Sequence, residues 1–252
     1  MNGIAALTAA SAVCIAVGIT AGLSVVYVFN RIPPSWLCDY GEEPSQELKD
    51  PHVKRLKENP WRWLCAAGLA CLCLRLLPGM GEITLTGIQM TASGLVAVWA
   101  MIIIGIADKK YMIIPDQFVL VLVVAAVGMA GIYRNTVSPL GIEGLIQPLA
   151  GLLLGGGFMV IIAGAGALTK KEILGWGDVK LCAGMGVFLG AEGIGTVMIA
   201  ASLASGAAAA AGLIRGKYGK DDSIPLGPYL CTCGALYVFT LWPMTMQMET
   251  WI

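Results

Sequence analysis

Long runs of apolar residues constrain the fold of this 252-residue chain more than any other feature. The hydrocarbon layer of a bilayer is ~30 Å thick, and a helix needs roughly 20 apolar residues to cross it. Backbone polar groups cannot stay unpaired in lipid, and the runs lack the alternation of barrel strands. We therefore predict an all-α, polytopic integral membrane protein with about eight transmembrane helices. The runs lie at 4–29, 61–77, 85–107, 118–133, 145–168, 179–189, 194–214 and 230–242.

Composition excludes a soluble globular protein. Hydrophobic residues make up 57% of the chain and charged residues 13%, and the mean hydropathy is +0.78, well above the range of soluble domains. The 16 basic and 16 acidic residues balance, so no surplus of charge favours a nucleic acid. The sequence predicts contact with the lipid bilayer and no nucleic-acid partner, and it indicates no particular oligomeric state.

The positions of the basic residues predict the orientation in the membrane. The first run follows Met1-Asn2-Gly3, which has no positive side chain, so we expect a retained helix and not a cleaved signal peptide. With the N-terminus outside, alternation places every lysine and arginine except Arg75 and Arg134 in the cytosol. This is the distribution that the positive-inside rule requires, and shifting the topology by one helix would invert it.

Three regions follow from this topology. Residues 1–29 are expected to form the first transmembrane helix, residues 30–60 a cytosolic loop, and residues 61–252 a membrane-embedded domain of about seven helices. The loop is rich in proline and in mixed charge. A segment of about thirty residues is too small to build its own core, so we expect the loop to fold against the helix ends.

The cysteines do not indicate a metal site. Most of the eight lie in apolar runs, and no two have CxxC spacing, which is common in zinc sites. The 30–60 loop offers only Cys38 and His52, whereas structural zinc usually takes four protein ligands. The sequence therefore predicts no metal and no cofactor.

Two acidic residues stand where predicted spans meet the cytosol. Asp108 follows the third apolar run and Asp178 immediately precedes the sixth, so the topology puts both on one side at similar depth. Two close carboxylates do not readily ionise together, which leaves one protonated and one charged. The charged member can take a proton from an attacking water while the neutral member protonates the peptide. This pattern indicates peptide hydrolysis.

Each of these acids also has a structural interpretation that the sequence leaves open. Asp108 stands beside two lysines, as an ordinary solvated helix end does. Asp178 can be a helix N-cap, and Asp116 resembles a cap for the fourth helix.

Glycines on both sides of Trp176 distinguish the Asp178 segment. Gly175 and Gly177 tolerate backbone conformations that other residues avoid. We expect them to interrupt helix geometry and to admit an extended substrate strand beside Asp178.

Three segments resemble those of the type IV prepilin peptidases, which are membrane aspartyl proteases of the GxGD type. They are Asp108 with the later Pro115-Asp116 pair, GWGDVKL from Gly175 to Leu181, and IPLGPY from Ile224 to Tyr229 with Leu226 in place of phenylalanine. The resemblance implies that Asp108 and Asp178 are the catalytic pair. It also implies supporting roles for Pro115, Asp116, Gly175, Gly177, Lys180, Gly227 and Pro228.

The resemblance further implies an aspartic endopeptidase of the cell membrane with its active site facing the cytosol, and residues 61–252 are then its peptidase domain. Expected partners are prepilin or pseudopilin-like precursors with a short basic leader before an apolar helix. Bifunctional family members carry paired CxxC motifs in the cytosolic loop, where this chain has Cys38 alone. We therefore expect no N-methyltransferase activity. Val26 also stands where the family usually has asparagine.

Three alternatives compete with this interpretation. A presenilin-like intramembrane protease shares the GxGD element but not the Pro115-Asp116 spacing or the Gly227-Pro228-Tyr229 segment. A transporter with an acidic cation or proton site requires acids deep within the spans, whereas these spans hold almost none. A catalytically inactive scaffold remains the third alternative.

Overall fold

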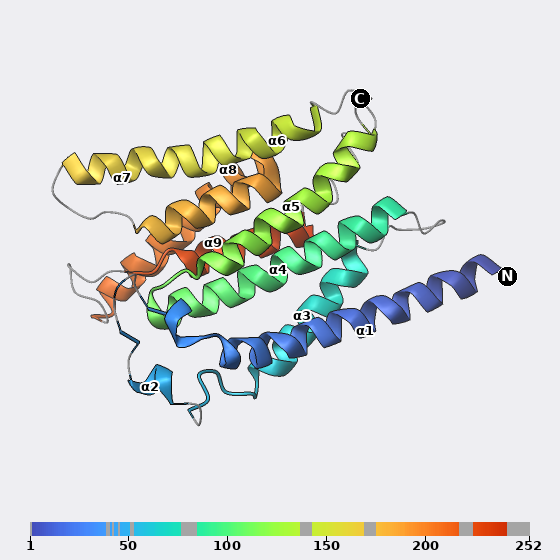
Figure 1. Cartoon of the computed structure of the whole chain (residues 1–252), viewed down its shortest axis with the longest axis horizontal. Coiled ribbons are helices and arrows are strands. Elements are labelled where there is room, and N and C mark those ends of the chain that lie inside the picture. The colour runs from blue at the N-terminus through green and yellow to red at the C-terminus, as the bar shows by residue number, and fades with distance from the viewer. Residues whose placement is uncertain are drawn as a thin grey trace.

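All regular structure in the described part of the chain is helical (Figure 1). The computed structural model describes residues 2–38, 41, 43–44, 46–50, 53–76, 85–136, 143–168, 175–216 and 224–240, and no strand occurs among them. The all-α prediction is confirmed for these residues. The α-helices are α1 (Asn2–Arg31), α2 (Gln46–Lys49), α3 (Trp61–Leu76), α4 (Leu85–Tyr111), α5 (Asp116–Thr136), α6 (Glu143–Leu152), α7 (Phe158–Leu168), α8 (Trp176–Ile214) and α9 (Gly227–Thr240). A short 3-10 helix, η1 (Pro34–Trp36), follows α1, and one turn of π-helix, η2 (Leu153–Gly157), joins α6 to α7.

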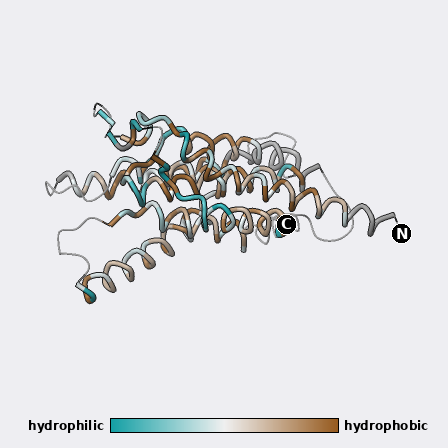
Figure 2. The backbone as a smooth tube through the Cα atoms, turned by 90° about the horizontal axis from the view of Figure 1, so that it is seen from below, coloured by the Kyte–Doolittle hydropathy of each residue, from teal (hydrophilic) through white to brown (hydrophobic). Residues whose placement is uncertain are grey.

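Four helical segments among the described residues are long and apolar enough to cross a membrane, and the chain is a membrane protein. They are Thr8–Arg31, Gly87–Tyr111, Ile146–Gly166 and Trp176–Ile214. Figure 2 shows hydrophobic residues along the lengths of the helices. Helices α3 and α9 have 16 and 14 residues, fewer than the roughly 20 of a perpendicular span. The expected total of about eight spans stays a prediction.

The interior of the bundle lies around α4, which packs against α1, α3, α5 and α9. Its side chains Met101, Ile103 and Ile104 are fully buried, together with Met185 of α8 and Leu230 of α9. Large apolar side chains on the outer faces are exposed instead; Leu153, Ile161 and Leu203 are each 71% exposed. An apolar exterior around an apolar interior is the arrangement of a helix bundle surrounded by lipid.

Helix α8 is folded back on itself at Gly190. This residue has φ 73° and ψ 179° within the 39-residue element, a combination open mainly to glycine. A Cβ added to Gly155 would lie 2.4 Å from the Cys182 oxygen and 3.0 Å from Ile194 Cγ1. In a straight helix those two residues would be about 18 Å apart along the axis. The element therefore contains two arms, with Gly190 in the interval between the predicted sixth and seventh runs.

Two glycines bring α1 and α3 close together. A Cβ on Gly18 would lie 2.5 Å from the Ala70 Cα, and one on Gly22 would lie 2.3 Å from the Ala66 Cα. Small residues at both sides of a crossing let helix backbones approach in a membrane. Trp99 of α4 donates its indole N–H to Ser24 on α1 at 3.0 Å, which ties the first helix to the centre of the bundle.

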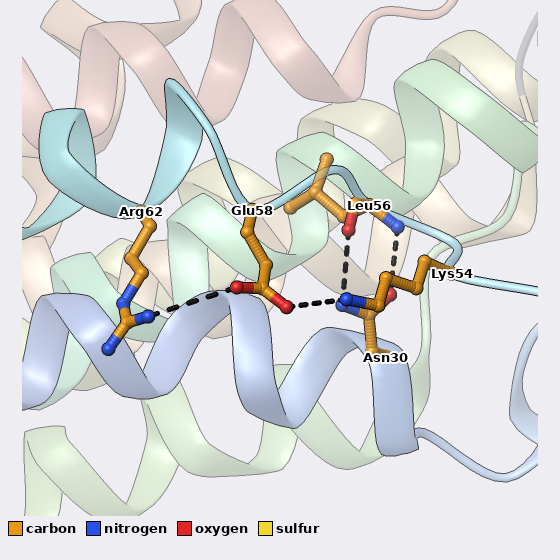
Figure 3. Close-up of polar contacts among 5 residues, drawn as sticks. All are labelled: Asn30, Lys54, Leu56, Glu58 and Arg62. Atoms are coloured by element: carbon orange, nitrogen blue, oxygen red, sulfur yellow. Dashed lines mark hydrogen bonds and ion pairs between the residues drawn. The ribbon is translucent and has the colours of Figure 1, made fainter.

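The segment after α1 is anchored to its C-terminal end through Asn30 (Figure 3). The Asn30 amide donates to the Leu56 carbonyl oxygen at 3.1 Å, and the Leu56 N–H donates back to Asn30 Oδ1 at 2.8 Å. Glu58 bonds Lys54 at 2.7 Å and lies 3.8 Å from Arg62 at the start of α3. The Lys54 hydrogen bond lowers the pKa of Glu58 below its ordinary value.

The same segment also packs against the ends of α4 and α5. Arg55 donates to the carbonyl oxygens of Ile32 and Leu48, and Lys110 at the end of α4 donates to the Arg55 carbonyl oxygen. The Trp36 ring meets Phe118 of α5 edge to face at 6.5 Å. The loop therefore folds against helix ends, as the sequence predicts.

Candidate functional site

Asp108 lies in the last turns of α4 and is buried, with 6% of its surface exposed. It is one of three buried polar or charged residues among those described, and the only carboxylate of the three. Its backbone oxygen accepts the N–H of Met112 at 2.8 Å, the residue that follows the last residue of α4. The position differs from a solvated helix end, because the side chain points into the bundle and not toward the neighbouring lysines, which are exposed.

The first residue of α9 lies directly against this carboxylate. The Gly227 N–H donates to the Asp108 carboxylate. A Cβ on Gly227 would lie 2.5 Å from Asp108 Oδ2 and 2.9 Å from its Cγ, distances that real Cβ atoms do not tolerate. Glycine is therefore required here for close approach, and the N-terminus of α9 also places partial positive charge near the carboxylate.

Asp178 lies in the first turn of α8. Gly175 precedes the helix with extended backbone, φ −73° and ψ 143°, and its carbonyl oxygen accepts the Asp178 N–H at 3.1 Å. The expected interruption of helix geometry is therefore found at Gly175 but not at Gly177, which lies inside α8. Gly177 serves packing instead, because a Cβ there would lie 3.2 Å from the Ile114 Cβ.

The helix ends bring Asp108 and Asp178 into one site at the junction of α4, α8 and α9. The two carboxylates lie near enough for each to affect the charge of the other, and the buried Cys231 of α9 lies near both. Asp108 Oδ2 and Asp178 Oδ1 are buried, and no group in the described part of the chain bonds either oxygen. Buried polar atoms are nearly always hydrogen-bonded, so these two unbonded carboxylate oxygens make the junction the candidate functional site.

Comparison with known proteins points to one family. The model of the type IV leader peptidase family matches residues 95–210, a range that contains both aspartates. The prepilin leader peptidase/N-methyltransferase of Aeromonas salmonicida (strain A449) is 30% identical over 230 residues, covering 85% of this chain and 73% of the relative. The chain belongs to the type IV leader peptidase family.

Shorter members of the leader peptidase family are also similar. Leader peptidase HopD of Salmonella typhimurium (strain LT2) is 34% identical over 135 residues, which cover 53% of this chain and 83% of the relative. HopD of Escherichia coli is 33% identical over 129 residues, 50% of this chain and 79% of the relative. No solved structure matches the chain.

The other residues that the resemblance singles out lie at the starts of α5, α8 and α9 and in the turn before α5. Asp116 is the first residue of α5, not the cap before it, and its carboxylate pairs with Lys180 of α8 at 3.0 and 2.8 Å. Pro115 is buried, and its carbonyl oxygen accepts the Phe118 N–H at 3.1 Å. Pro228 occupies the first turn of α9, where proline is tolerated because its missing N–H would have no helical partner.

Cys231 and Ile114 are site neighbours that the sequence did not identify. Cys231 is 4% exposed and packs on α4, where a Cβ on Gly105 would lie 3.2 Å from the Cys231 Cβ. Its position four residues after Gly227 places both on one face of α9, which is the signal that the sequence offers. The described residues contain no cluster of three or more His, Cys, Asp or Glu side chains that could hold a metal ion.

Proposed function

We propose that this chain is an aspartic endopeptidase that removes the short leader from type IV prepilin-like precursors at the cytosolic face of the cell membrane. Family membership supports the reaction class, and the printed names of the relatives refer to prepilin and to leader peptides. The assignment of Asp108 and Asp178 as the catalytic pair is supported by one observation above the others: each has a buried oxygen that no described group bonds.

The surroundings of the pair suit acid–base chemistry on a peptide bond. Asp108 is buried beside the Gly227 N–H, whereas Asp178 is only partly buried, at the exposed beginning of α8. Since their charges interact, the pair is expected to hold one proton between its two members. The proton is shared, so its titration belongs to the pair and is not assigned to one of the two residues.

Hydrolysis would then proceed without a cofactor. The ionised carboxylate accepts a proton from water as the water oxygen attacks the scissile carbonyl carbon, and the neutral carboxyl donates its proton to the carbonyl oxygen. The tetrahedral intermediate collapses when the carbon–nitrogen bond breaks and the leaving amine takes a proton from the pair. The products are the free leader and a precursor with a new N-terminus.

We expect the purified protein in lipid to cleave a short-leader prepilin without methylating the product. The expected mass spectrum contains the free leader and the shortened pilin, with no added methyl group when S-adenosylmethionine is supplied. The physical reason is that the cytosolic loop lacks the cysteines for a zinc tetrad. A precursor that stays intact would refute the proposed peptidase activity. Stoichiometric methyl transfer would refute only the expectation that N-methyltransferase activity is absent.

The proposed topology has the N-terminus outside, about eight spans and both aspartates at the cytosolic face. Single cysteines replacing the exposed residues Lys54 and Arg215 should therefore react with a membrane-impermeant maleimide only after the cytosolic side is opened. A cysteine at the exposed Arg75 position should react in intact cells and serves as the control. Labelling of Lys54→Cys from outside would show that the chain has the opposite orientation in the membrane.

A further inference from the structure

The turn between α4 and α5 contacts α8 on both sides of Asp178 in the sequence. Ile114 in this turn packs on Gly177, where a Cβ would lie 3.2 Å from the Ile114 Cβ. Asp116, at the start of α5, receives two hydrogen bonds from the Lys180 ammonium, at 3.0 and 2.8 Å. Gly177 comes just before Asp178 and Lys180 shortly after it. The turn therefore holds the first turn of α8 at two points.

The same turn is fixed to Asp108 at its other end. Met112 follows the last residue of α4 and donates its N–H to the Asp108 carbonyl oxygen at 2.8 Å. Its φ of 55° lies in the left-handed region, which few residues other than glycine adopt. The chain turns sharply at Met112, so the connection between Asp108 and Asp116 is short and its backbone conformation is fixed.

We propose that the Asp116–Lys180 ion pair is a positioning device that holds Asp178 at its working separation from Asp108. Neither Asp116 nor Lys180 reacts with the substrate; each acts through the helix end that carries it. The catalytic meaning of this separation rests on the proposed function. The ion pair itself joins the two segments whether or not the protein cleaves leaders.

Loss of either partner should slow catalysis without unfolding the protein. Lys180→Gln and Asp116→Asn are each expected to lower kcat for leader cleavage by about five-fold with KM nearly unchanged, because small misplacements of reacting groups are costly. Lys180→Arg should keep most of the activity, since a guanidinium also pairs with both carboxylate oxygens. The double variant should be no slower than the slower single variant, because both remove one interaction.

A matched control is available in the cytosolic loop, where Lys49 pairs with Glu43 at 3.0 Å. Lys49→Gln also breaks one ion pair, an exposed one that involves neither α4 nor α8, and should leave kcat unchanged. Partly exposed pairs contribute little to global stability, so all these variants should unfold near the wild-type temperature. Losses that multiply in the double variant, or Lys180→Arg as slow as Lys180→Gln, would show that the residues act separately.

A distance measurement tests the device independently of turnover. Spin labels at the exposed Gln117 and Trp176 positions, introduced as cysteines, report the separation of α5 from α8 by pulsed electron resonance. The cysteines that are not buried are first replaced by alanine: Cys14, Cys38, Cys71 and Cys233.

The distribution of distances between the two spin labels should be narrow in the otherwise wild-type protein and with Lys180→Arg or Lys49→Gln. With Lys180→Gln it should be broader or displaced. An unchanged distribution with Lys180→Gln would overturn the positioning role even in an active peptidase. A broadened one in a protein that cleaves no leader would support the device and refute the proposed function.

Discussion

Asp108→Asn and Asp178→Asn should each reduce leader cleavage by about 10²- to 10⁴-fold, the contribution typical of a positioned general acid or base. An amide keeps the size of the side chain but can neither accept the proton from water nor share one with its partner. Cleavage rates of purified variants on a short-leader prepilin, measured by mass analysis, provide the test. The double variant should be about as slow as the single ones, because the two groups act as a unit.

Both variants should still insert and fold, since each puts a neutral group where a carboxylate oxygen is buried and adds no buried charge. Glu192→Gln is a suitable control because Glu192 is exposed on α8 near Gly190, outside the junction of α4, α8 and α9. It should retain wild-type activity. Turnover close to wild type in either aspartate variant would remove the proposed mechanism.

Gly227→Ala should have the second-largest effect. The added Cβ would lie 2.5 Å from Asp108 Oδ2 and 2.9 Å from Asp108 Cγ, so either the carboxylate must turn away or the start of α9 must move. Displacement of the carboxylate by about 1 Å can cost up to 10²-fold in rate. Overpacking of this kind also typically costs about 1–3 kcal/mol of stability.

The matched control for Gly227→Ala is Gly68→Ala on α3, because a Cβ at Gly68 meets no atom within 4 Å. That substitution should be neutral or slightly stabilising, as alanine is favoured over glycine in helices. The comparison is made on cleavage rate and on the midpoint of thermal unfolding in the same detergent. A Gly227→Ala protein with both values unchanged would mean that Asp108 does not depend on close contact with α9.

The helices were predictable from the sequence because one physical rule dominates them. Lipid forbids unpaired backbone groups, so each apolar run had to be helical, and α4 and α5 extend only a few residues beyond the runs at 85–107 and 118–133. The interval between the sixth and seventh runs was also visible. What hydropathy does not indicate is that Gly190 turns the chain within one element, since that depends on a single backbone conformation.

Side-chain contacts within the site depend on packing between distant segments, which a single sequence does not encode locally. Topology predicted that Asp108 and Asp178 would lie on one side of the membrane. It did not predict the Lys180–Asp116 pair, whose partners are 64 positions apart, or the fit of Gly227 against Asp108. Gly177 shows the reverse error: its conformational freedom suggested a broken helix, whereas its missing side chain is used to admit Ile114.

The dependence of Asp108 on α9 has a consequence for the order in which the protein is made. Asp108 and Asp178 emerge from the ribosome well before Gly227, whose N–H bonds the Asp108 carboxylate. Until α9 has been made and has packed against α4, a nascent chain holds both acids but lacks the helix end that completes their surroundings. The proposed catalytic pair is therefore completed only after α9 has been made, later than either of its two acids.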